Sequence, residues 1–309
     1  MQTAVKLAVI GTASFVAAHP VSQEMVNAIR SSNALWTPTE VSQNKFANYT
    51  EAQLKGLLGT VLSHQSGISA FTQINAALPD SFDSRTQWKD CVHPIRDQAK
   101  CGSCWAFAAV ESLSDRFCIA SQGKVNLVLS PQDMLSCDAS NFCCFGGYLD
   151  TAWQYLEQQG VGSDSCEPYK SGNGDQPSCP SKCSNGQAIK KYKCKAGSTK
   201  QAKGAEATKS LIQQSGPVET GFTIYEDFLN YNSGIYHHVT GGNMGGHAVK
   251  ILGWGKQGLE NYWIVANSWG EDWGEKGYFN IRQGDSGIDE ATFGCIPDVS
   301  SALENEFIQ

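Results

Sequence analysis

The chain has 309 residues, of which 41% are hydrophobic and 17% are charged, and its formal net charge is −7. This length is enough for one large domain, or for two lobes with accessory segments. A mildly acidic chain without a Lys- and Arg-rich run gives no basis for nucleic-acid binding, and its acidity indicates solubility rather than a particular substrate.

Residues 1–18 are predicted to be a secretory signal peptide. A single early lysine, Lys6, precedes the apolar run 7–10, and the segment ends on the small residues Val16-Ala17-Ala18. A membrane anchor is the alternative, but the uncharged stretch is short and no later window approaches a spanning length. We therefore expect a protein of the secretory pathway without a membrane span, destined for a lysosome or vacuole or for the extracellular space.

Residues 19–77 contain no cysteine and differ in character from the rest of the chain. Two helices are predicted here, one over 22–30 with Ser22 as its cap and one from Thr50 to Leu58. Asn48-Tyr49-Thr50 is a glycosylation acceptor pattern. A removable propeptide fits these features, although on the residues alone a small N-terminal subdomain remains possible.

The chain from Leu78 onward changes from helical to strand-like patterns. Helices are predicted over 105–113, 130–135, 148–159 and 205–214. Runs rich in β-forming residues lie at 248–252, 262–266 and 278–281. A helical half followed by a β half predicts an α+β fold of two lobes with a cleft between them.

The twelve cysteines all lie between Cys91 and Cys295. Behind a signal peptide, such a set is typical of a disulfide framework. Zinc binding is the alternative, but Cys101 and Cys104 form the one Cys-x-x-Cys pair, and no second pair or closely spaced histidine pair follows. We expect no bound metal.

Cys104 is the candidate nucleophile, because it precedes a buried helix and a thiol at a helix N-terminus has a lowered pKa. His247, at the start of a strand, is the candidate base, and Asn267 could orient its imidazole through a hydrogen bond. Trp269 could shield that contact from water, and Gln98 could donate an N–H to an oxyanion. The other histidines of this region, His93, His237 and His238, are interpreted as packing or surface residues.

Cys101-Gly102-Ser103-Cys104-Trp105 resembles the local signature of papain- and cathepsin-type cysteine peptidases, which combine it with a downstream His and Asn. His247 follows Cys104 by 143 residues, inside the roughly 130–150 of that signature. The chain most resembles the cathepsin B subfamily. The resemblance implies a papain-like fold over 78–309, with a helical left lobe and a β-barrel-like right lobe, preceded by a short helical inhibitory propeptide at 19–77.

The resemblance also implies an activity and its residues. Cys104 would attack a peptide carbonyl with His247 as its partner, Asn267 would orient His247, and Gln98 would stabilise the oxyanion. Substrate-binding roles fall on Gly102, Gly146, Gly147, Trp269 and Ala291. No cofactor is needed. The expected partners of this zymogen, as a monomer, are protein or peptide substrates, its own propeptide and cystatin-like inhibitors.

Five disulfides follow from the same resemblance: Cys91–Cys118, Cys101–Cys144, Cys137–Cys179, Cys166–Cys183 and Cys194–Cys295. Cys104 must stay free to act. Cys143 is left over, because its usual partner is replaced at Asp138, and we interpret it as a buried inert thiol.

The chain departs from cathepsin B in two places. The subfamily carries an occluding loop with a histidine pair that holds a substrate's C-terminal carboxylate, but residues 167–182 contain no histidine. We therefore predict an endopeptidase with an open cleft. Ala291 stands where cathepsin B has a carboxylate at the floor of the pocket for the residue two before the scissile bond. This predicts a preference for apolar residues over Arg, because a buried Arg would lack a partner there.

Two alternative functions remain at this point. Cys101 and Cys104 could form the redox pair of a thiol-disulfide oxidoreductase, although the βαβ context of such enzymes is missing. A catalytically inactive, peptide-binding homologue is the second alternative, and no feature of the sequence favours it.

Overall fold

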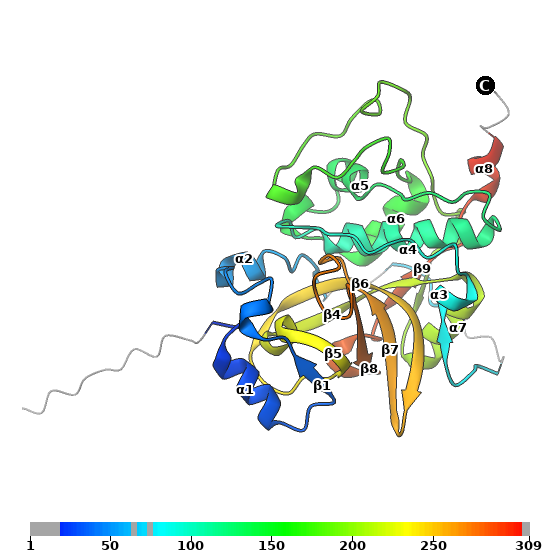
Figure 1. The fold of residues 1–309 in the computed structure, drawn as a ribbon. Helices are drawn as coiled ribbons and strands as arrows, with labels where there is room; N and C mark the ends of the chain where they lie inside the picture. Colours follow the sequence, from blue (N-terminus) through cyan, green and yellow to red (C-terminus); the bar gives the residue numbers. More distant parts are fainter. Residues whose placement is uncertain (1–18, 63–66, 73–76, 305–309) are drawn as a thin grey trace, which may run out of the picture.

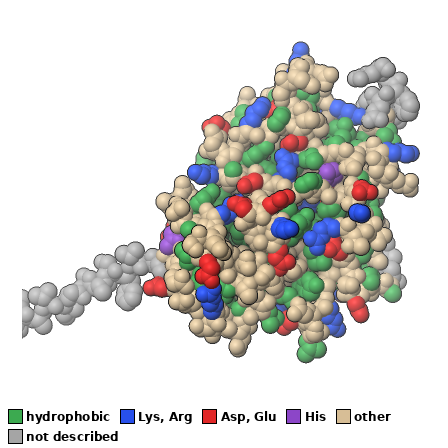
Figure 2. Space-filling view, viewed as in Figure 1, with side chains coloured by type: hydrophobic (Ala, Val, Ile, Leu, Met, Phe, Trp, Pro, Cys, Tyr) green, Lys and Arg blue, Asp and Glu red, His purple; other side chains and the backbone are tan. Residues whose placement is uncertain are grey.

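The computed structural model describes residues 19–62, 67–72 and 77–304, so the expected signal peptide lies outside the described residues. A layer of helices rests on a twisted sheet, with the helix α4 between them (Figure 1). In the part of the chain that is described, no helix is long and apolar enough to cross a membrane. Acidic and basic side chains are interspersed on the face drawn in Figure 2.

The sheet has nine strands in the order β1-β5-β8-β7-β6-β4-β9-β3, with β2 paired to β6. The strands are β1 (Trp36–Pro38), β2 (Phe82–Asp83), β3 (Lys200–Ala202), β4 (Val218–Tyr225), β5 (Tyr231–Tyr236), β6 (Asn243–Gln257), β7 (Glu260–Ala266), β8 (Tyr278–Arg282) and β9 (Thr292–Gly294). The expectation of a barrel-like lobe needs correction, because β1 and β3 end the order without pairing to each other. Both are only three residues long, too short to close the sheet.

The helices are α1 (Gln23–Ser31), α2 (Glu51–Lys55), α3 (Ser84–Gln87), α4 (Cys104–Ala120), α5 (Pro131–Cys137), α6 (Leu149–Gln158), α7 (Ala205–Ser215) and α8 (Val299–Glu304). Short 3-10 turns lie at Val41–Gln43, Cys143–Phe145, Ser171–Asn173, Glu226–Asn230 and Asp285–Gly287. Ser22, Thr50 and Ser130 cap α1, α2 and α5 through their side-chain oxygens, and the sequence predicts Ser22 and Ser130 as caps.

Three predicted bounds were wrong. The helix expected to reach Leu58 ends at Lys55, because the chain turns at Gly56. The helix α4 continues to Ala120 and is buried on all sides through Cys118, so its amphipathic pattern is weak. The strand β6 does not end with the predicted run 248–252 but continues through Gly253. A Cβ at Gly253 would lie 2.0 Å from the Phe82 carbonyl oxygen, so this glycine allows β2 to pair there.

The described residues form two hydrophobic cores. One belongs to the sheet and includes Trp254, Trp263 and Phe279, and the other belongs to the helices and includes Trp105 and Trp153. Side chains from residues 19–62, among them Trp36, Phe46, Leu54 and Leu57, are part of the sheet's core. The N-terminal segment therefore packs against the sheet lobe and shares its hydrophobic core.

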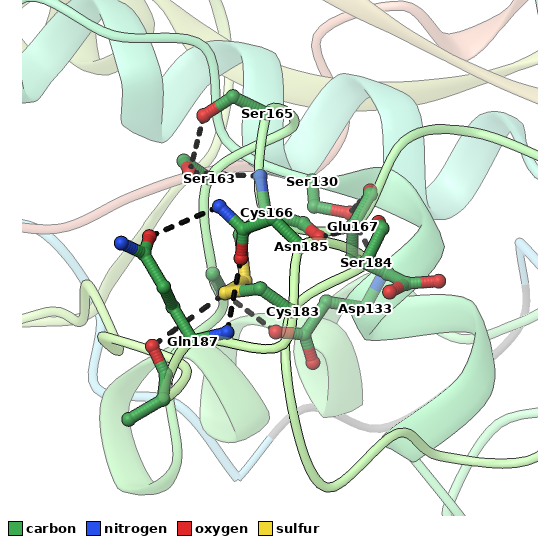
Figure 3. Close-up of a disulfide and its surroundings, with 12 residues drawn as sticks. Ser130, Asp133, Ser163, Ser165, Cys166, Glu167, Cys183, Ser184, Asn185 and Gln187 are labelled. Atoms are coloured by element: carbon green, nitrogen blue, oxygen red, sulfur yellow. Dashed lines mark hydrogen bonds between the residues drawn. A yellow bond between two sulfur atoms is a disulfide. The ribbon is translucent and has the colours of Figure 1, made fainter.

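The structure pairs ten cysteines in the five combinations that the resemblance implies. Figure 3 shows Cys166 joined to Cys183, with hydrogen bonds at Ser163 and between Asn185 and Gln187. This disulfide closes the segment in which the family's occluding loop was expected to be missing. The segment extends above the helical lobe in Figure 1.

Candidate active site

Cys104 is the first residue of α4 and is fully buried. The loop before it is fixed by the Cys101–Cys144 disulfide and by a hydrogen bond from the Gly102 amide to the Cys144 carbonyl. The two members of the Cys-x-x-Cys pair are thereby separated, since Cys101 is bonded to Cys144 while Cys104 is free. This arrangement does not support a redox pair.

His247 lies on β6, and its ring Nε2 is 2.8 Å from the Asn267 Oδ1. Both residues are fully buried, and the Trp269 ring lies over the imidazole with a centroid separation of 4.7 Å. The Nδ1 atom of His247 has no hydrogen-bond partner among the described residues. The ring is held at one nitrogen and left available at the other, as a general base requires.

Gln98 is also fully buried, and its side chain is fixed at both ends. Its Oε1 accepts a hydrogen bond of 2.7 Å from the Ser268 hydroxyl, and its Nε2 donates to the Cys101 carbonyl at 2.8 Å. The same Nε2 donates to the carbonyl of Leu57 at 2.9 Å. A carbonyl of the N-terminal segment therefore meets the proposed oxyanion donor.

The N-terminal segment passes over the nucleophile. The Thr60 hydroxyl lies 3.2 Å from the Cys104 Sγ. The Gly147 amide donates to the Gly59 carbonyl and the Gly147 carbonyl accepts from Val61, while the Thr60 amide donates to the Gly246 carbonyl. These bridges clamp the segment between the lobes, parallel to the chain at Gly147 and antiparallel to the chain at Gly246.

Glycines allow this close approach. A Cβ at Gly246 would come within 2.2 Å of the Thr60 carbonyl oxygen, and one at Gly146 within 2.7 Å of the Gly59 carbonyl oxygen. Gly102 contacts Gly59 so closely that a Cβ on Gly59 would lie 1.8 Å from the Gly102 carbonyl oxygen. Glycine on both sides of the contact gives a groove that accepts an extended backbone.

Burial of Cys104 and His247 disfavours the thiolate and the imidazolium. Desolvation raises the pKa of the Cys104 thiol, although a hydrogen bond with Thr60 acts in the opposite direction. Desolvation lowers the pKa of His247 to about 4, against the effect of its bond to Asn267. With the N-terminal segment in place, the thiol and the imidazole are therefore both neutral near pH 7.

A cavity of about 550 Å³ lies beyond Thr60, and Leu62 lines it. Ala291 lines the same cavity, as the resemblance implies, and so does its neighbour Glu290. The other charged residues of the wall are Asp150 and Lys203. The pocket is therefore apolar at Ala291 but has a carboxylate one residue away.

The remaining histidines make structural contacts. His93 pairs with the buried Asp115 at 2.7 Å, and the His238 ring stacks on Tyr225 with a centroid separation of 3.7 Å. Nε2 of His237 accepts a hydrogen bond from the Leu35 amide of the N-terminal segment.

Cys143 is half-buried rather than buried, which corrects the expectation of a buried thiol, and desolvation raises its pKa. Within residues 19–62, 67–72 and 77–304, no three His, Cys, Asp or Glu side chains are grouped as metal ligands would be.

Three residues that contact the site, Leu57, Thr60 and Gly246, were not among the predicted site residues. Leu57 belongs to the helix predicted from Thr50 to Leu58, where its apolar side chain indicates packing, and a threonine beside a thiol has no sequence signature. The run of small residues before His247 was the one available signal for Gly246.

Comparisons with known proteins identify the family to which the chain is similar. A family model described as papain family cysteine protease matches residues 78–296. Cathepsin B-like cysteine proteinase 4 of Caenorhabditis elegans is 44% identical over 72% of this chain and 76% of its own length. Cathepsin B-like CP3 of Giardia intestinalis is 36% identical, with 94% and 98% covered. The solved proCathepsin B S9 from Trypanosoma congolense superposes with a TM-score of 0.84 at 33% identity, covering 90% of this chain and 99% of that one.

Proposed function

The chain belongs to the papain family of cysteine proteases and is a cathepsin B-like cysteine peptidase, and on that premise we propose how its residues divide the reaction. The Cys104 thiolate attacks the peptide carbonyl, and His247 gives its proton to the leaving amine. The Gln98 side chain and the Cys104 amide stabilise the oxyanion, and water then hydrolyses the thioester. Asn267 orients His247, and Trp269 keeps water from that contact.

One observation carries this assignment. The Gln98 Nε2 donates to the Leu57 carbonyl at 2.9 Å, three residues before Thr60, whose hydroxyl contacts the Cys104 sulfur. A carbonyl group of the same segment that contacts the Cys104 sulfur is thus bound at the donor that the reaction needs. An oxyanion donor must lie at such a distance from the developing charge.

The N-terminal segment is the inhibitory propeptide, and residues 78–309 form the peptidase domain. This division is supported by the family match, which begins at residue 78, and by the burial of Cys104 under Thr60. A zymogen with a signal peptide fits a lysosomal or vacuolar enzyme as well as a secreted one. After removal of the propeptide, the groove is open to protein substrates and to cystatin-like inhibitors.

The enzyme acts as an endopeptidase, because the segment between Cys166 and Cys183 contains no histidine to hold a C-terminal carboxylate. A matched pair of peptides tests this, one with a free C-terminal carboxylate and one amidated. We expect comparable kcat/KM values. A strong preference for the free acid, with release of dipeptides, would contradict the assignment.

The pocket at Ala291 selects the residue two before the scissile bond. Its position in the same cavity as Leu62 supports an apolar preference, while the exposed Glu290 at the rim is the competing feature. Hydrolysis rates of fluorogenic Phe-Arg and Arg-Arg substrates distinguish an apolar preference from a preference for Arg. We expect faster cleavage of Phe-Arg, and equal cleavage would count against Ala291 as the determinant.

The catalytic assignment itself is tested by titrating the acid-activated protein with an epoxysuccinyl inhibitor. We expect one equivalent to abolish hydrolysis and mass spectrometry to place the label on Cys104, with Cys101 still bonded to Cys144. Hydrolysis that persists in Cys104→Ala, or label on another cysteine, would refute it.

A further inference from the structure

Lys45 of the propeptide docks its ammonium group on the peptidase domain at a place outside the catalytic constellation. Its Nζ lies 2.6 Å from the Asp272 Oδ1 and 3.5 Å from the Asp97 Oδ2, and it donates a hydrogen bond to the Trp269 carbonyl. The Lys45 side chain is only 17% exposed in this position. Three oxygens from two separate loops therefore surround one cation.

Gly270 provides the space for this cation. A Cβ there would lie 2.9 Å from the Asp97 Oδ2, 3.0 Å from the Asp272 Oδ1 and 3.3 Å from the Lys45 Nζ. The Gly270 amide is also fixed by a hydrogen bond to the Arg96 carbonyl. The two carboxylates thus face each other across a residue without a side chain, and any larger residue would crowd the position of the ammonium group.

The place of this group in the cleft follows from the course of the propeptide. Phe46 packs edge-on against the Trp269 ring, Leu57 meets Gln98, Thr60 covers Cys104, and Leu62 reaches the Ala291 cavity. The chain therefore crosses the nucleophile between Lys45 and Leu62. Because the Ala291 cavity takes residues before the scissile bond, Lys45 lies on the side of the leaving group.

We propose that Asp97, Asp272 and the Trp269 carbonyl form a cation-binding subsite that accepts a Lys or Arg side chain of the substrate after the scissile bond. The proposal rests on the proposed function. The two carboxylates are already 49% and 66% exposed while Lys45 is bound, so they remain accessible beside the groove when the propeptide leaves and takes Lys45 with it. A Lys or Arg side chain of the substrate then takes the place of the Lys45 ammonium.

One neighbouring cation, the Lys100 ammonium, weakens the attraction of this subsite for a basic side chain. Lys100 lines the same cavity as Asp97, Trp269 and Lys45, and its ammonium lies 5.8 Å from the centre of the Tyr49 ring of the propeptide. Two carboxylates and a carbonyl against one exposed ammonium still leave the local balance negative. The preference for a basic residue is therefore that of a partly exposed ion pair, about two- to fivefold in kcat/KM.

The test uses the activated enzyme and internally quenched peptides that differ at one position. Lys, Gln or Glu is placed at the first, second or third residue after the scissile bond. We expect the Lys peptide to exceed the Gln peptide at one of these positions, by less at high salt because exposed charges are screened. The ratio of two peptides on one enzyme cancels any general change in activity.

Three variants connect the preference to the carboxylates. Asp97→Asn keeps an oxygen that can accept from the Ala99 amide, as the Asp97 Oδ1 does at 2.7 Å. This variant and Asp272→Asn should each reduce the Lys/Gln ratio, and Asp272→Lys should favour the Glu peptide instead.

A Lys/Gln ratio of one at all three positions, with the Gln peptide cleaved normally, would overturn the subsite and leave the peptidase assignment intact. A Lys preference that survives all three variants would overturn it as well. Failure to cleave any peptide or to label Cys104 would overturn both proposals.

Discussion

Removing the amide of Gln98 is the most direct test of the oxyanion assignment. In the zymogen this side chain is fully buried, donates to the Leu57 carbonyl at 2.9 Å, and is held by the Ser268 hydroxyl at 2.7 Å. A donor fixed in this way needs no reorganisation when negative charge develops. Loss of one such donor typically lowers kcat by about 10²–10³, or about 3–4 kcal/mol.

We therefore expect Gln98→Ala to lose about that factor in kcat, with a much smaller change in KM, because the donor acts mainly on the transition state. Gln98→Glu is the matched control, since it keeps the acceptor for Ser268 but removes the donor at neutral pH. It should lose at least as much as Gln98→Ala.

The assay is steady-state hydrolysis of a Phe-Arg substrate, normalised by titration of the reactive Cys104 thiol, with thermal unfolding as a check on the fold. A loss of less than threefold in both variants, at an unchanged number of active sites, would refute the assignment of Gln98. A rise in KM with an unchanged kcat would instead indicate that Gln98 contributes to substrate binding in the ground state.

Three further predictions follow from buried charge. Cys104 in the intact zymogen should react slowly with iodoacetamide between pH 5 and 7 and faster once the propeptide is gone, because burial raises its pKa and lowers that of His247 to about 4; equal rates would contradict this. Burial raises the pKa of Glu111 to about 7 from 4.5, so its contribution to stability is complete below pH 4.5 and declines by up to about 3 kcal/mol as the pH rises through 7. Glu111→Gln should lack this decline in urea unfolding at pH 4 and 8, and parallel profiles would count against it. Lys250→Met leaves Glu111 and Asp115 without the ammonium that lies 2.7 Å from Asp115, so it should destabilise the fold by about 3–5 kcal/mol, and a loss below 1 kcal/mol would be the contrary result.

Local features of the fold could be predicted from the sequence. Ser22, Thr50 and Ser130 cap helices because a side-chain oxygen next to a helix start satisfies a free amide, which depends on a few neighbouring residues. The position of Cys104 at the start of α4 is equally local. His247 and Asn267 could be found only in combination, because each has a common structural interpretation when taken alone.

The open sheet and its register could not be predicted. Trp36 on β1 pairs with Gly234 on β5, about two hundred residues later, and a three-residue strand has no period to detect. The predicted run 248–252 stops just before Gly253, although in the structure Gly253 continues β6 and allows a close contact with Phe82. Such features depend on partners distant in the sequence, which a window of neighbouring residues does not contain.

The direction of the propeptide explains how one groove can be filled without being cleaved. A substrate that places its acyl part at Ala291 and its leaving group at Trp269 runs opposite to the propeptide, which goes from Lys45 to Leu62. Reversal keeps the backbone hydrogen bonds to Gly147 but brings the Thr60 hydroxyl, rather than a carbonyl carbon, to 3.2 Å from the sulfur. The propeptide therefore uses the Gly147 contacts that we assign to a substrate, with the Thr60 hydroxyl beside the thiol. Because the propeptide lies in the same groove as a substrate, each propeptide side chain occupies a place that a substrate side chain would take. The Lys45 contacts therefore indicate which side chain the enzyme accepts on the leaving-group side.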